Sequence, residues 1–136
     1  HARVFGATIF LAYSMVGGPE VPRRDFEAAE NSLEHEKNAL LDKKLPCKTI
    51  MSVRGLEAGE DLVQLANERQ VDEVIVGVRR RSKVGKIIFG STAQYVVLNA
   101  PCPVVTVKRG FRCQGVKALY PDTSYETTIV NVCTTE

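Results

Sequence analysis

The sequence of 136 residues lacks tryptophan, has only two histidines and has no long apolar run, and the last two features each exclude a class of protein. No run approaches the roughly 18 residues of a membrane span and no secretory signal is recognisable, so we expect no membrane partner. The formal net charge of +2 excludes a strong overall field for nucleic acid. Neither His1 nor His35 has metal-type partners nearby in the sequence, and we predict no metal site. Because the chain starts with His1 and not with methionine, we interpret it as a fragment, a processed product or a chain with a tag remnant.

Cysteines are also few, and their spacing shows no CxxC or Cys/His ligand pattern. The four cysteines are Cys47, Cys102, Cys113 and Cys133. Scattered cysteines of this kind are typical of reduced thiols in a cytoplasmic protein, which is the location that we predict. Cys47 and Cys102 fall at the edges of expected strands and are predicted to pack in the core, whereas the two cysteines of the tail have no predicted place.

The stretch Val71–Lys108 organises the rest of the chain. The short β-branched run Val74–Val76 favours a strand buried on both faces, and Gly77 ends it. The loop that follows carries five basic residues: Arg79, Arg80, Arg81, Lys83 and Lys86. Small and apolar residues then recur at helical spacing at Ala93, Val96, Val97 and Ala100. Two prolines end that helix, and Val104–Val107 form a second buried strand, so the stretch predicts a right-handed βαβ unit.

Anion binding is the chemistry that this stretch suggests. Gly90 would let the backbone approach a ligand, and Ser91 and Thr92 can cap the helix, whose free N–H groups and positive dipole end then point at a phosphate. A capped helix behind a tight turn, without a ligand, is the alternative. The basic loop is open to the same two interpretations, a solvated loop or a clamp for a ligand.

The same stretch resembles the universal stress protein family. In that family the fourth strand is followed by a glycine, two residues, a second glycine, nine residues, and then Gly-Ser or Gly-Thr. Gly77 matches the first glycine, Gly90-Ser91 matches the final pair with the spacing intact, and the segment Asn99–Val105 is similar to the family's closing segment. Arg80 stands at the position of the second glycine, which is a departure from the pattern.

The remaining segments alternate between extended and helical patterns. Strands are expected over Ala7–Tyr13 and Cys47–Val53, and helices over Asp25–Lys44, with Asp25 as a plausible N-cap, and over Glu57–Gln70. The resemblance implies that His1–Phe5 is the last turn of an earlier helix. The alternation predicts an α/β fold with an open, mostly parallel sheet, whose ligands lie beyond the carboxyl ends of the strands. The resemblance implies that this sheet is five-stranded and Rossmann-like, with helices on both faces.

The resemblance also implies a strand that the start of this sequence does not supply. Family members begin with a strand ending in Asp, and this strand lies between the second and fourth strands; without it, two rows of backbone groups would be unpaired, each costing about 1–3 kcal/mol if buried. Thr127–Cys133 favours a strand similar to that segment, with Cys133 at the aspartate position. We expect a domain over 1–108 and an extension over 109–136 whose strand fills the slot, in its own subunit or a partner's. Pairing only at an edge or a dimer interface, and the start of a second domain copy, stay open.

By resemblance, the function is that of a regulatory module that binds ATP or another adenine nucleotide, with or without Mg²⁺, in stress response and without robust catalysis. The adenine would lie against Ala12, Met51 and, in the tail, Cys133. The phosphates would run over Gly77, Gly90, Ser91 and Thr92. Arg79 and Lys86 could add positive charge, and Arg80 belongs to the same candidate site although it adds bulk where the backbone needs to approach phosphate.

The sequence leaves two alternatives to this function open. A nucleotide-free, dimeric interaction protein of the same family is the first alternative, and the resemblance implies a homodimer through the strand at 103–107 in either case. A weak ATPase or phosphohydrolase is the second, but the stretch Gly77–Ser91 contains no histidine, paired carboxylates or Walker lysine, so we predict no catalytic residue. Nucleic-acid binding through Arg79–Arg81 is disfavoured because no aromatic residues interleave with the arginines.

Overall fold

The computed structural model describes residues 2–17, 20–78, 90–108 and 130–134, and the fold below concerns these ranges. The elements follow the order α1 (Ala2–Phe5), β1 (Thr8–Ser14), α2 (Arg23–Leu41), β2 (Cys47–Ser52), α3 (Ala58–Glu68), β3 (Glu73–Val78), α4 (Ser91–Asn99), β4 (Val104–Lys108) and β5 (Val130–Thr134). The alternation of strands and helices that the sequence predicts is confirmed.

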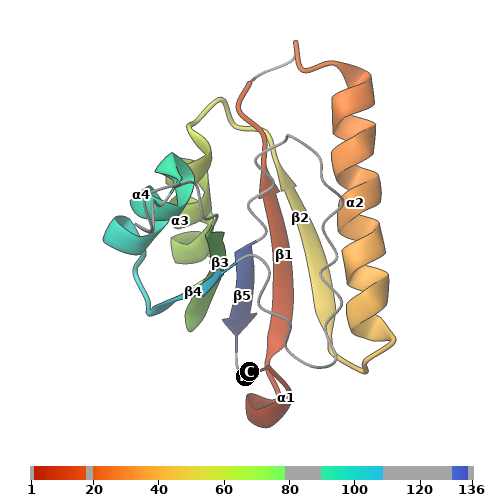
Figure 1. The fold of residues 1–136 in the computed structure, drawn as a ribbon, viewed down its shortest axis with the longest axis vertical. Helices are drawn as coiled ribbons and strands as arrows, with labels where there is room; N and C mark the ends of the chain where they lie inside the picture. The colour runs from red at the N-terminus through yellow and green to blue at the C-terminus, as the bar shows by residue number, and fades with distance from the viewer. Residues whose placement is uncertain (1, 18–19, 79–89, 109–129, 135–136) are drawn as a thin grey trace.

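The strands form one five-stranded sheet in the order β2-β1-β5-β3-β4. β1 pairs in parallel with β2, and β3 pairs in parallel with β4, whereas β5 runs antiparallel to both of its neighbours. Figure 1 shows β5 in the middle of the sheet, with its arrow opposed to the other strands. The sheet is therefore mostly parallel, as predicted, with one reversed strand at its centre.

The central slot is filled by the tail strand of the same chain. Val132 pairs with Phe10 of β1 and with Val74 of β3, so backbone groups on both sides of the slot have partners. Pairing at an edge alone is thus wrong. The strand begins at Val130, and residues 127–129 of the predicted strand lie outside the described residues.

The reversed direction of β5 removes one residue, Cys133, from the expected site. Cys133 pairs with Ile9 and Glu73, near the amino ends of β1 and β3. A parallel strand would have carried Cys133 to the carboxyl edge, where the family's aspartate is expected, but an antiparallel strand carries it to the opposite edge. Cys133 is therefore not part of a site at the carboxyl ends of the parallel strands.

Helices cover the two faces of the sheet, with α2 on one face and α3 and α4 on the other (Figure 1). Side chains alternate between the faces. Beneath α2, Ile9 and Leu11 pack with Leu33. Beneath α3 and α4, the core consists of Ala12, Leu62, Leu65, Ala66, Val71, Val74 and Val96.

Strand β3 is less enclosed than its sequence predicts. Val74, Val76 and Val78 face α3 and α4 and are buried, but Ile75 on the other face is only partly buried and Gly77 is exposed. Complete burial of both faces is therefore wrong for this strand.

Two helix details also differ from the predictions. Helix α2 has Pro22 as its N-cap, and Asp25 lies inside the first turn, where its charge still complements the helix dipole. The fixed φ of proline, here −57°, starts the helix before Asp25 is reached.

In α4, Ala93 and Val96 are buried as predicted, but Val97 is 40% exposed, so the buried stripe is narrower than the apolar pattern.

Candidate functional site

The amino end of α4 is the part of the carboxyl edge with the clearest capacity to bind an anion. Gly90 is the N-cap, with φ −64° and ψ 157°, and no side chain in the described residues caps this end. The carbonyl of Gly90 accepts the first helical hydrogen bond, from the N–H of Gln94 at 2.9 Å. The N–H groups of Ser91, Thr92 and Ala93 precede that bond and have no acceptor within the helix.

The prediction that Ser91 or Thr92 caps this helix is therefore wrong. Both residues lie inside the first turn of α4, and a capping side chain must come from the residue that precedes the turn. Their hydroxyls remain at the helix start, Ser91 exposed and Thr92 partly buried. The uncapped N–H groups and the two hydroxyls form a cluster of hydrogen-bond donors.

The packing of the described residues does not require glycine at position 77 or at position 90, the two glycines of the predicted phosphate loop. A Cβ built at Gly77 or at Gly90 meets no described atom within 4 Å. Neither glycine has the positive φ that only glycine adopts easily. Their open surroundings are what a ligand that lies against the backbone would need.

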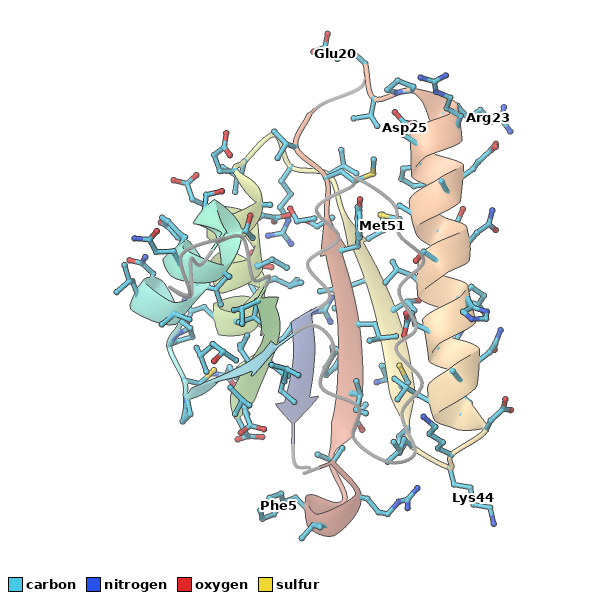
Figure 2. All side chains as sticks on the ribbon, viewed as in Figure 1. Phe5, Glu20, Arg23, Asp25, Lys44 and Met51 are labelled. Carbon is cyan, nitrogen blue, oxygen red and sulfur yellow. The ribbon has the colours of Figure 1, made fainter. Side chains whose placement is uncertain are left out.

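Ala12 and Met51, the two predicted adenine contacts, lie on opposite faces of the sheet. Ala12 is buried in the core below α3 and α4, and Ile50 packs against the same core. Met51 follows Ile50 and so turns to the other face, where it packs against the cluster below α2 and lies between the sheet and that helix (Figure 2). The two side chains do not line one surface. Arg79, Arg80 and Lys86 lie outside the described residues.

A buried polar cluster that the sequence did not reveal joins β1, β2 and α3. The carboxylate of Asp61 is 1% exposed. It accepts a hydrogen bond from Ser14 Oγ at 2.5 Å on Oδ2 and from Ser52 Oγ at 2.9 Å on Oδ1. One signal was available: Asp61 precedes Leu65 by four residues and so lies on the apolar stripe of its helix.

Arg54, just after β2, adds a positive group to this cluster. Its Nε lies 3.6 Å from Oδ1 of Asp61. Its two terminal nitrogens donate to the two oxygens of Glu68 at 2.8 and 2.9 Å, the fork geometry that suits a carboxylate. This hydrogen bond, with a second from Gln64, lowers the pKa of the Glu68 carboxyl. Arg54 thus holds the β2–α3 connection against both ends of α3.

Apolar residues continue beyond the polar cluster at the carboxyl edge. The N–H of Met15 donates to the carbonyl of Ser52 at 2.9 Å, which extends the contact of β1 with β2 by one residue. Val16 and Val53, in the segments that follow these strands, are 60% and 36% exposed. This edge therefore offers exposed hydrophobic surface next to a rigid polar junction.

The two thiols whose side chains are described are poor nucleophiles. Burial raises the pKa of Cys47 to about 11, against opposing attraction from Lys37, and burial also raises the pKa of Cys102. Both cysteines pack against core clusters, as predicted. Within the described ranges, no three His, Cys, Asp or Glu side chains gather as metal ligands, and no helix is long and apolar enough to cross a membrane.

Solved structures share this fold. A universal stress protein from Archaeoglobus fulgidus superimposes with a TM-score of 0.73 and 32% identity, over 79% of this chain and 80% of that one. A structure of the universal stress protein from the same organism in complex with dAMP has a TM-score of 0.68 and 27% identity, over 79% of this chain and 78% of that one.

Sequence relatives point to the same family. A universal stress protein from Mycolicibacterium smegmatis is 33% identical over 62% of this chain and 65% of its own length. A relative from Thermus aquaticus is 28% identical over 79% of this chain and 82% of its own length. The chain thus spans slightly less than two thirds of the first relative. The sequence model of the universal stress protein family matches residues 1–108, and the chain belongs to that family.

Proposed function

We propose that this chain binds an adenine nucleotide at the carboxyl edge of its sheet and acts as a regulatory module in stress response, in the cytoplasm and without robust catalysis. The observation that carries the proposal is the start of α4, where the N–H groups of Ser91, Thr92 and Ala93 have no acceptor within the helix and no described side chain caps them. Such a helix start is suited to a phosphate because it combines free donors with the positive end of the helix dipole.

The phosphates would lie along Gly77, Gly90, Ser91 and Thr92. The open space at the two glycines supports this path, since the ligand could approach the backbone there without displacing a described side chain. Arg79, Arg80 and Lys86 follow β3 in the sequence and would supply positive charge to the same path.

The base would lie at the ends of β1 and β2. There Ala12 is buried below the surface, so its contribution would be the shape of the pocket floor, and Met51 would contribute through its backbone because its side chain points toward α2. The dAMP bound by the Archaeoglobus fulgidus protein supports an adenine nucleotide as the ligand class.

Calorimetric titration with ATP, with and without Mg²⁺, tests the proposal. Wild-type protein should bind, and Gly90→Val should lose binding because its side chain occupies the path of the phosphates while its fold is unchanged. Glu60→Val, at an exposed position in the first turn of α3, is the matched control and should bind as the wild type does. Absence of heat with the wild-type protein would contradict nucleotide binding.

The second candidate function is that of a nucleotide-free, dimeric interaction protein. It is favoured by β4, which lies at the edge of the sheet with Val107 45% exposed, so one row of backbone groups faces outward. A homodimer through residues 103–107 would cover that edge in either function. Light scattering of Thr106→Pro, compared with wild type, tests the dimer, because the parallel register of β4 turns the N–H of Thr106 away from β3. Phosphate release from ATP, measured in parallel, distinguishes the weak ATPase or phosphohydrolase.

A further inference from the structure

We propose that Asp61 is a positioning residue for the base end of the nucleotide: it fixes the carboxyl ends of β1 and β2 to the first turn of α3. This inference rests on the proposed function, because it assigns the base to these strand ends. Asp61 itself would not touch the ligand, since it is 1% exposed and both of its oxygens are engaged.

The geometry places the junction directly below the edge. Ser14 and Ser52 are register partners and form the last pair of the β1–β2 ladder. Their two hydroxyls donate to different oxygens of one carboxylate, at 2.5 and 2.9 Å. A single side chain from α3 therefore joins both strand ends to the helix and, together with the backbone ladder between them, fixes their separation and their height relative to α3.

The choice of a buried carboxylate is informative because packing alone does not require it. Removing a carboxylate from water is costly, and an apolar cluster of similar volume is often as stable as a buried polar one. Each hydrogen bond, however, fixes a distance and a direction, which apolar contacts do not. Asp61 thus contributes more to the geometry of the edge than to the stability of the fold.

The junction of Asp61 with Ser14 and Ser52 positions the segments that follow β1 and β2. The N–H of Met15 donates to the carbonyl of Ser52, and the partly exposed Val16 and Val53 follow. A planar base that packs on this apolar surface and bonds to nearby backbone groups needs both strand ends at a fixed separation. Without the junction, the ends can shift by the tenths of an ångström that such contacts do not tolerate.

A triple variant separates an effect on the position of the strand ends from an effect on the stability of the fold. Asp61→Leu with Ser14→Ala and Ser52→Ala replaces the carboxylate and its two hydroxyl donors together, so no buried hydroxyl loses its partner. Arg54 keeps its two hydrogen bonds to Glu68, and the change in stability should be small. Leu33→Ala, in the core below α2, is the control for simple loss of stability. The probes are ATP, which engages both ends of the site, and tripolyphosphate, which engages only the phosphate end.

The triple variant should lose about tenfold in affinity for ATP and keep its affinity for tripolyphosphate within about twofold. Its Met15 N–H should also exchange with solvent faster than in wild type, after correction for global stability. Leu33→Ala should change neither the ratio of the two affinities nor that corrected exchange. Unchanged ATP affinity and unchanged exchange at Met15 in the triple variant would overturn the inference alone. Failure of the wild-type protein to bind ATP would overturn the proposed function and this inference together.

Discussion

Gly59 of α3 and Tyr95 of α4 lie so close that a Cβ on Gly59 would be 2.8 Å from the Cβ of Tyr95. Non-bonded carbon atoms do not approach to that distance, so this glycine allows the two helices to pack at their observed separation. The same contact sets the position of α4, whose first turn holds the proposed phosphate site. The spacing of two helices on one face of the sheet is therefore linked to the geometry of the proposed phosphate site.

Gly59→Val should destabilise the fold by about 2 kcal/mol or more, because overpacking at the helix contact outweighs the small gain in helix propensity from glycine to valine. Urea unfolding would measure the loss. Glu60→Val, at the neighbouring exposed position, introduces the same side chain without the clash and should lose only about 0.5 kcal/mol, because valine has a lower helix propensity than glutamate. Equal losses in the two variants would show that α3 and α4 tolerate a wider separation.

Val132→Pro should abolish cooperative folding or cost about 3 kcal/mol or more. β5 pairs with β1 on one side and with β3 on the other, and proline can donate no hydrogen bond within a central strand. The variant Val132→Thr keeps both the N–H and the β-branched shape and should cost less. Thermal unfolding followed by circular dichroism compares them, and a stable proline variant would contradict the central position of β5.

The alternation of elements was predictable because short extended segments alternate along the chain with segments whose apolar residues recur at helical spacing. The central strand was predictable from the empty slot, since unpaired backbone groups in mid-sheet would be costly. Its direction was not. Alternation of side chains is the same whichever way a strand runs, so the pattern of Val130–Thr134 carries no information about parallel or antiparallel pairing.

At the proposed site, the glycines at 77 and 90 were predicted from their spacing, and a Cβ at either position meets no described atom within 4 Å. The faces of Ala12 and Met51 follow from strand parity, which a motif comparison alone does not consider. Asp61 was missed because its partners, Ser14 and Ser52, are 47 and 9 residues away in the sequence. Only the fold brings those hydroxyls to one carboxylate.

Cys47 should alkylate slowly at pH 8.5 in the folded protein. Burial raises its pKa from 9.0 to about 11, so the reactive thiolate is scarce. Because the folded pKa is the higher one, this thiol stabilises the fold below pH 9 and loses that contribution as the pH rises from about 9 to about 11. Mass-spectrometric mapping of iodoacetamide labelling would measure the rate, with the urea-unfolded chain as control. Equal rates in the two states would contradict the burial of the thiol.

Gly77→Ala and Gly6→Ala should separate ligand binding from stability. Gly6 has a φ of 63°, so alanine there should cost about 1 kcal/mol through backbone strain, without an effect on nucleotide affinity. Gly77 lacks a positive φ, and a Cβ there meets no described atom, so alanine should leave the free energy of unfolding within about 0.5 kcal/mol of wild type. The same methyl group should weaken ATP binding if the phosphates lie against this backbone. Urea unfolding and calorimetry on both variants give the free energy of unfolding and the ATP affinity. Unchanged ATP affinity in Gly77→Ala would show that the phosphates do not lie against β3.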